Sequence, residues 1–283
     1  MGKLLLVILG ALLVMQGTAA ADETGAVYGS GKQHFSLATG SPGELGLLKM
    51  LAEEFARGHD AQVHWLKAGT GASLNLLKQA KVDMVMVHAP AQVDQAVKDG
   101  WAAGKTLIGS NEFYLVGPKS DPAGVAKSSS AIDAYRRIAA AAAKFVSRGD
   151  NSGTHQKEMQ IWQKAGLQPG GPWYIVTKDF MTASLKRANA EGAYFMSDSS
   201  TWIMEKGVAP DLVILYRGDQ GLVNTYHALI SSPPGKTPGR DTAEKFIAFV
   251  ASPSGQLIMR DYGRRDYGEG LYNDAAYARQ FDR

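Results

Sequence analysis

Residues 147–155 read Ser147-Arg148-Gly149-Asp150-Asn151-Ser152-Gly153-Thr154-His155, between a short apolar run (144–146) and an amphipathic run (157–165). This order predicts a strand, a loop and the first turn of a helix. The first N–H groups of a helix lack partners within it, and the helix dipole adds partial positive charge. With glycines, hydroxyls and an arginine beside them, such groups make a candidate anion site. The alternative is an N-cap followed by a surface arginine.

Glycine- and hydroxyl-rich corners like this one recur along the chain, each beside a strand candidate and a helical pattern. They are residues 39–41, 67–73, 179–184 and 197–201. The strand candidates are 34–38, 62–66, 82–88, 112–116, 173–176, 193–196 and 212–216, and the helical patterns include 45–57, 74–80, 91–100, 131–143, 154–165 and 185–190. This alternation predicts an α/β fold whose ligand-binding corners lie beyond the carboxyl ends of the strands.

Two extended runs start at Asn and end at Pro, residues 111–118 and 224–234. We interpret them as two hinge strands that cross between two lobes. The predicted organisation is then an N-terminal arm (22–33), lobe 1 (34–112), lobe 2 (113–223), a return to lobe 1 (224–262, with helices at 242–251 and 254–262) and a surface-bound or frayed C-terminal tail (263–283).

The first 21 residues predict a secretory signal peptide. Lys3 supplies a positive charge, residues 4–15 form an apolar core, and Ala19-Ala20-Ala21 offers a cleavage site near Ala21. The core is shorter than the ~20 residues that span a bilayer, although an uncleaved anchor is the alternative. We therefore expect an exported protein, and a bacterial periplasm is the compartment that fits best.

Composition narrows the possible partners. The 283 residues are 45% hydrophobic and 20% charged, which is ordinary globular composition with room for two lobes. The formal net charge of +3 is too small to predict a nucleic-acid partner, and there is no long basic run. The absence of cysteine excludes disulfides, thiolate metal sites and cysteine nucleophiles.

The residues give little support to an enzyme. Ser152, His155 and Asp150 superficially resemble a hydrolase triad, but neighbours on one helical turn do not by themselves give triad geometry. The sequence has no G-x-S-x-G turn and no H-E-x-x-H motif. We therefore expect no catalytic residue, no bound metal cation and no cofactor. We expect His155 to pack locally, His88 to be buried structure, and Asp150 to orient the loop or pair with Arg148.

Several motifs together resemble the periplasmic tungstate-binding proteins of ABC importers. The resemblance runs from about residue 37 to 262 and rests on residues 145–155, Ala68-Gly69-Thr70-Gly71, Val87-His88-Ala89-Pro90, residues 112–118 and Trp173-Tyr174. It implies a type II periplasmic binding protein fold, in which each lobe is a mixed sheet flanked by helices and two hinge strands join the lobes. It also implies that the lobes close on a tetrahedral oxyanion, tungstate or molybdate, and that an ABC permease recognises the closed form.

The same resemblance implies three sets of ligand contacts, which are Thr39 and Ser41 in the first loop, Gly69, Thr70 and Gly71 in the second, and Arg148, Ser152, Gly153 and Thr154 in the arginine motif. The first loop departs from the family pattern of three threonines and a serine, because it reads Ala38-Thr39-Gly40-Ser41-Pro42, and Ser199 stands where arginine is frequent. Phosphate, sulfate or a small organic acid are therefore alternative ligands. A sensor or scavenger is the alternative to a transport protein, and we expect a monomer.

Overall fold

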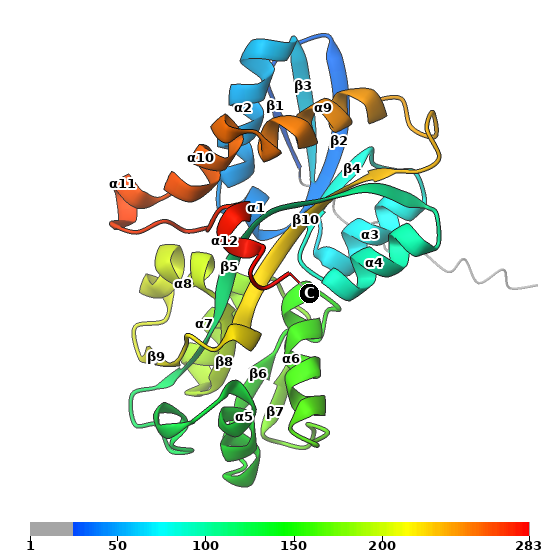
Figure 1. Cartoon of the computed structure of the whole chain (residues 1–283). Helices are drawn as coiled ribbons and strands as arrows, with labels where there is room; N and C mark the ends of the chain where they lie inside the picture. The colour runs from blue at the N-terminus through cyan, green and yellow to red at the C-terminus, as the bar shows by residue number, and fades with distance from the viewer. Residues whose placement is uncertain (1–24, 283) are drawn as a thin grey trace, which may run out of the picture.

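The computed structural model describes residues 25–282, so the signal peptide predicted at 1–21 lies outside the described residues. Figure 1 shows two lobes with long strands running between them. The strands form one sheet in the order β1-β3-β2-β4-β10-β5-β8-β6-β7, and β9 pairs with β5 beside that path. The predicted mixed α/β architecture, a sheet flanked by helices, is confirmed.

Lobe 1, at the top of Figure 1, is built on β1 to β4 and on parts of β5 and β10. Strand β2 lies parallel to β3 and β4, whereas β10 runs antiparallel to β4 and β5. The bounds of these strands are β1 Ala26–Tyr28, β2 Gln33–Thr39, β3 Ala61–Lys67, β4 Met84–Val87, β5 Ala102–Pro118 and β10 Val223–Ser231. Apolar side chains of α2 (Leu47–His59), α9 (Arg240–Ala251) and α10 (Pro253–Asp261) cover one face, and those of α3 (Thr70–Lys78) and α4 (Pro90–Lys98) cover the other.

Lobe 2 repeats this layered arrangement. Strand β6 lies parallel to β7 and β8, and both β8 and β9 run antiparallel to the second half of β5. The bounds are β6 Phe145–Ser147, β7 Tyr174–Val176, β8 Tyr194–Asp198 and β9 Leu212–Tyr216, with short 3-10 turns at Val125–Lys127, Lys206–Val208 and Gln220–Leu222. Helices α5 (Ala131–Ala140) and α6 (Gly153–Lys164) cover one face, and α7 (Met181–Glu191) and α8 (Ser199–Glu205) cover the other.

Strand β5 is much longer than the strand predicted at 112–116. It has 17 residues, of which the first half pairs with β10 and the second half with β8 and β9. Asn111 of β5 stands opposite Asn224 of β10, where the two strands pass between the lobes. The sequence prediction missed residues 102–110 because Gly104, Lys105 and Thr106 break the apolar pattern, and only pairing with β10 makes this stretch extended.

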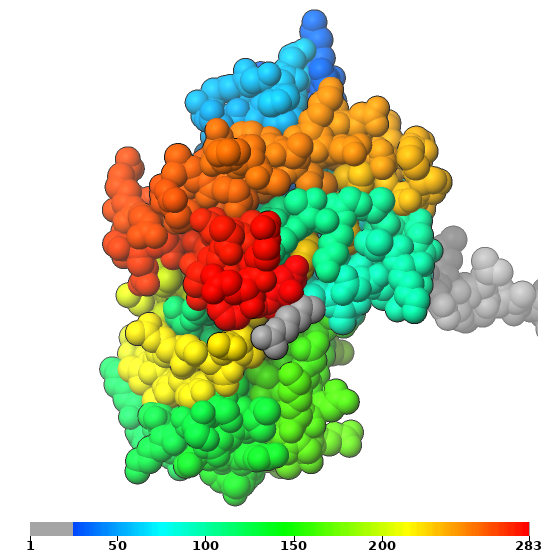
Figure 2. All heavy atoms as spheres, in the orientation of Figure 1, coloured from blue at the N-terminus to red at the C-terminus, as the bar shows by residue number. Residues whose placement is uncertain are grey.

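The C-terminal tail is bound to the surface rather than frayed. It contains α11 (Arg264–Tyr267) and α12 (Ala275–Ala278), and Leu271 and Tyr272 are buried. Asn273 exchanges backbone hydrogen bonds with Ser110 of β5, at 2.7 and 3.0 Å. Figure 2 shows the red C-terminal segment lying over the boundary between the lobes. Judged by length and hydropathy, no helix within residues 25–282 could cross a lipid bilayer.

One buried carboxyl group lies in the aromatic core of lobe 2. Oε1 of Glu158 accepts hydrogen bonds from the Tyr174 hydroxyl (2.6 Å) and from Nε1 of Trp162 (3.2 Å). Burial raises the pKa of Glu158 to about 7, although both donors favour the charged form. The folded state therefore holds this proton more tightly than the unfolded chain does.

We predict that Glu158→Gln stabilises the protein in alkaline but not in acidic solution. Because the folded-state pKa is raised from 4.5 to about 7, the wild-type free energy of unfolding falls as the pH rises through that window. Glutamine keeps an oxygen acceptor for Tyr174 and Trp162 without the charge. Urea unfolding at pH 4 and pH 8 should show a gain of up to about 3 kcal/mol at pH 8 and little at pH 4. An equal effect at both pH values would contradict the prediction, and the exposed Glu53→Gln serves as the control.

Candidate functional site

The three predicted loops converge where the lobes meet. Residues 39–41 begin at the last residue of β2, residues 69–71 follow β3 and residues 148–154 follow β6, so each loop lies at the carboxyl end of its strand. A Cβ atom on Gly69 would lie 3.5 Å from Cβ of Ser152 in the other lobe, and one on Gly40 would lie 3.4 Å from the carbonyl oxygen of Ala68. The fold thus brings the two loops of lobe 1 together, and it places residues 69–71 in close proximity to residues 148–154 of lobe 2.

Glycine is required at two positions of this junction, because the opposite lobe leaves no room for a side chain. A Cβ atom on Gly71 would lie 2.6 Å from Nδ2 and 2.9 Å from the backbone oxygen of Asn151. One on Gly153 would overlap the ring of His88. The two glycines therefore permit an approach of the lobes that any larger residue would prevent.

Helices α3 and α6 both begin at this junction. In α3 the first intrahelical bond runs from the Ser73 N–H to the Gly69 carbonyl (2.8 Å), so the N–H groups of residues 70–72 have no partner within the helix. In α6 the hydroxyl of Ser152 accepts a hydrogen bond from the His155 N–H (3.3 Å), which leaves the N–H groups of Gly153 and Thr154 unpaired within the helix. Two helix N-termini from opposite lobes thus offer N–H donors and partial positive charge to an anion.

The guanidinium of Arg148 is the buried cation of the site, with 4% of the residue exposed. Its Nε donates to the carbonyl oxygen of Asp179 (3.2 Å), and Nη2 donates to Oδ2 of Asp150 (2.6 Å). The other carboxylate oxygen of Asp150 accepts from the Ser152 N–H (3.1 Å). The expectation that Asp150 pairs with Arg148 and orients the loop is confirmed.

The hydroxyl groups of the candidate site differ in what they can donate. Thr39 donates its hydroxyl proton to the Met86 carbonyl (2.8 Å), so that proton is not free for an anion in this conformation. The Thr70 hydroxyl accepts from the His88 N–H (3.4 Å), which leaves its own proton free. Thr154 is buried, and its hydroxyl makes no hydrogen bond within residues 25–282, while Ser41 is half-buried at the start of α1 (Ser41–Glu44). Thr70 and Thr154 are therefore the better placed hydroxyl donors.

The hydrolase-like residues do not form a triad. Nδ1 of His155 accepts from the Asn151 N–H (3.0 Å), and the Ser152 hydroxyl contacts the backbone of His155 rather than its ring. Asp150 pairs with Arg148 instead of His155. Burial lowers the pKa of His155, in keeping with a ring that accepts a hydrogen bond. His155 therefore has the local packing role that the sequence suggested.

A chain of buried polar groups crosses the hinge directly beside the junction. Nδ1 of His88 contacts Oδ1 of Asn224 (2.9 Å), Nδ2 of Asn224 donates to Oδ1 of Asn111 (2.7 Å), and Nδ2 of Asn111 donates to Ser200 (2.9 Å) and to Asp198 (3.2 Å). Burial lowers the pKa of His88 to about 4, so the ring is neutral at neutral pH. Since Nδ1 must donate to the amide oxygen, Nε2 carries the lone pair and has no hydrogen to donate to an anion.

Lys67 and Phe180 also reach the junction, and no motif in the sequence identified them. Nζ of Lys67, at the end of β3, pairs with Oε1 of Glu44 (2.6 Å) and lies 4.3 Å from the ring centroid of Phe180 in the other lobe. The Phe180 ring also lies 5.6 Å from Cζ of Arg148. Both residues belong to predicted corners, but only the folded structure shows that the corners touch.

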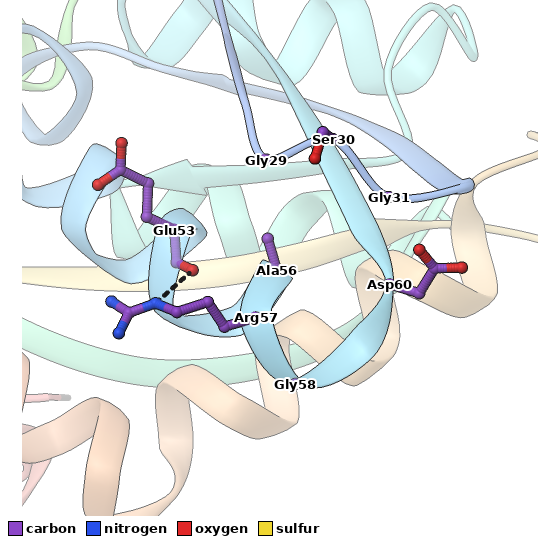
Figure 3. Close-up of a pocket in the computed structure, with 8 residues that line it drawn as sticks. All are labelled: Gly29, Ser30, Gly31, Glu53, Ala56, Arg57, Gly58 and Asp60. Carbon is purple, nitrogen blue, oxygen red and sulfur yellow. Dashed lines mark hydrogen bonds between the residues drawn. The ribbon is translucent and has the colours of Figure 1, made fainter.

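Two of the cavities within residues 25–282 bear on where an anion could bind. One, of about 630 Å³, lies at the end of lobe 1 away from the junction (Figure 3). Its charged lining residues are Glu53, Asp60 and Arg57, so two carboxylates face one cation and disfavour an anion. The second, of about 480 Å³, lies between the lobes on the hinge side and shares His88 and Gly153 with the junction. Its lining has two lysines, Lys157 and Lys164, and no carboxylate. Within residues 25–282, no group of three or more His, Asp or Glu side chains is arranged to hold a metal ion.

Comparisons with known proteins agree with this fold. A family model described as a PBP superfamily domain matches residues 18–254. The tungstate-binding protein TupA of Campylobacter jejuni is 30% identical over 223 residues, which cover 77% of this chain and 82% of that protein. The structure of the tungstate ABC transporter from Geobacter sulfurreducens is 36% identical with a TM-score of 0.74, covering 82% of this chain and 100% of that one. The tungstate-binding protein TupA from Desulfovibrio alaskensis G20 is 34% identical with a TM-score of 0.70, covering 85% and 98%.

We predict that Gly71→Ala prevents full closure of the junction. The added methyl group would meet the backbone oxygen of Asn151 at 2.9 Å, and relief requires the lobes to move apart. Overpacking of this kind costs about 1–3 kcal/mol, so the affinity for a tetrahedral oxyanion should fall at least about fivefold. Titration calorimetry with tungstate measures this effect. Gly58→Ala in α2, where a methyl group meets no atom within 4 Å, is the matched control. Unchanged affinity in Gly71→Ala would refute the steric argument.

Proposed function

The chain belongs to the PBP superfamily and, within it, to the periplasmic tungstate-binding proteins of ABC importers, and we propose that it captures tungstate or molybdate between its lobes. The observation that carries the proposal is the meeting of two helix N-termini, from α3 and α6, beside the buried guanidinium of Arg148. This arrangement offers N–H donors and partial positive charge to one small dianion from both lobes.

The charge balance of the junction favours recognition by hydrogen bonds over recognition by net charge. Arg148 is paired with Asp150, and Lys67 is paired with Glu44, so each cation is offset by a carboxylate of its own lobe. A dianion is therefore stabilised mainly by the helix N-termini and the O–H donors of Thr70 and Thr154. Charge-assisted hydrogen bonds contribute roughly 1.5–3 kcal/mol each. Five or six of them support the about −8 kcal/mol of sub-micromolar binding after association costs.

We assign nine residues to the ligand site: Thr39, Ser41, Gly69, Thr70, Gly71, Arg148, Ser152, Gly153 and Thr154. Thr39 contributes less than the others, because its hydroxyl proton is held by Met86. The protein acts in the periplasm after loss of its leader, as a monomer that presents the closed form to an ABC permease. This is a binding role rather than a catalytic one, in keeping with relatives that are binding proteins of transporters.

A small organic acid is the second candidate ligand, because of the hinge-side cavity. Its volume of about 480 Å³ falls in the range of small-molecule pockets, and Lys157 and Lys164 make its lining positive. A tetrahedral oxyanion fills only a small part of such a space. The narrow junction is the better site for tungstate, whereas the hinge-side cavity suits a longer anion.

A thermal-shift panel separates these ligands. We predict that tungstate and molybdate raise the melting temperature more than sulfate, phosphate or small carboxylates do, because they are the ligands proposed for this site. A bound ligand raises the melting temperature because it binds only the folded state. At a concentration about 100-fold above its dissociation constant, a ligand stabilises the fold by about 2.7 kcal/mol. A shift with carboxylates alone would move the assignment to the hinge-side cavity, and no shift with any tetrahedral anion would reject the proposed function.

We predict that Arg148→Ala lowers the affinity for the oxyanion at least about tenfold, because one charge-assisted contact is lost. The loop should stay in place, since Asp150 still accepts the hydrogen bond from the Ser152 N–H. Titration calorimetry gives the affinity and circular dichroism checks the fold. Arg187→Ala, an exposed arginine in α7 that pairs with Glu191, is the matched control. Equal binding by Arg148→Ala and the wild type would remove Arg148 from the site.

A further inference from the structure

The ring of Phe180 lies close to two cations that belong to different lobes. Lys67 Nζ, from lobe 1, stands 4.3 Å from the ring centroid, and Arg148 Cζ, from lobe 2, stands 5.6 Å from it. Cations are attracted to the face of an aromatic ring, and more strongly where water is excluded. Phe180 therefore links the buried cation of the anion site to a charged residue of the opposite lobe.

Packing within lobe 2 does not account for the position of Phe180. The residue is 36% exposed and belongs to neither apolar cluster of lobe 2. Its segment is instead anchored to Arg148, because the Lys178 N–H donates to the Arg148 carbonyl (2.8 Å) and the Asp179 carbonyl accepts from Nε of Arg148 (3.2 Å). This places an aromatic ring at the edge of the anion site, with a face turned to lobe 1.

Lys67 is held in place for this contact by its own lobe. Its ammonium group pairs with Oε1 of Glu44 at 2.6 Å, and both side chains are partly buried. The pair Lys67–Glu44 lies within lobe 1, and the pair Arg148–Asp150 lies within lobe 2, so neither needs the lobes to be closed. The contact of Lys67 with Phe180 is different, because it exists only while the lobes meet.

We propose that Phe180 and Lys67 form a latch that stabilises the closed form over the bound oxyanion. The proposal rests on the proposed function, and it assigns both as positioning residues that act through closure rather than through contact with the ligand. A contact present only in the closed form shifts the equilibrium toward closure by its own free energy. For a partly shielded cation–π contact this is about a three- to tenfold change.

The latch predicts that dissociation is affected more than association. Phe180→Leu, which keeps apolar volume but loses the aromatic face, and Lys67→Gln should each raise the dissociation rate of tungstate about three- to tenfold in stopped-flow experiments. The double variant should be no worse than the stronger single variant, because both changes remove the same contact. Tyr267→Leu in α11, an exposed aromatic residue away from the junction, is the matched control. Additive effects of the two changes, or a slower association with unchanged dissociation, would overturn the latch.

A second measurement tests the latch without any ligand. The chain has no cysteine, so spin labels attach only to cysteines that are introduced. Lys49→Cys in α2 and Lys186→Cys in α7 place one label at an exposed position on each lobe. Phe180→Leu should shift the interlobe distance distribution of the labelled protein toward longer values. An unchanged distribution would overturn the latch. If tungstate does not bind the wild type, the proposed function fails while this distance measurement still decides the latch.

Discussion

The N-terminal ends of two helices, both partially positive, meet at one junction between the lobes, and the rest of the structure depends on this arrangement. Helices α3 and α6 each bring unpaired N–H groups and about half a positive charge to it. Their corners approach until only 3.5 Å would separate a Cβ atom on Gly69 from Cβ of Ser152. Two positive helix ends repel one another unless negative charge lies between them. Under the proposed function, an anion at the junction stabilises closure and so couples ligand binding to the conformation of the two lobes.

The two cations at the junction, Arg148 and Lys67, are each paired with a carboxylate of the same lobe. Arg148 would be costly to bury alone, and Asp150 offsets that cost while it also holds the loop through the Ser152 N–H. Lys67 and Glu44 are matched in the same way in lobe 1. Each half of the site is thus stable by itself, and the lobes are free to separate and meet again without breaking either pair.

The hinge contributes a buried polar network rather than an apolar one. Asn111 and Asn224 stand opposite each other on the two crossing strands, and their amides connect His88 of lobe 1 to Asp198 of lobe 2. A hydrogen-bonded network of this kind favours one register of the strands, since a shifted register would leave buried donors unpaired. The hinge strands therefore keep the two halves of the ligand site aligned.

The sequence by itself determined the alternation of strands and helices, the corners that begin α3 and α6, and the place of Arg148 in the loop before α6. Those features depend on local patterns: apolar period, N-capping hydroxyls and glycine. Only the tertiary structure decided the full length of β5, the binding of the tail through Asn273, and the contact of Lys67 with Phe180. Each of these arises between segments far apart in the chain, where pairing and burial override local propensity, and no local pattern records which distant partner a residue will meet.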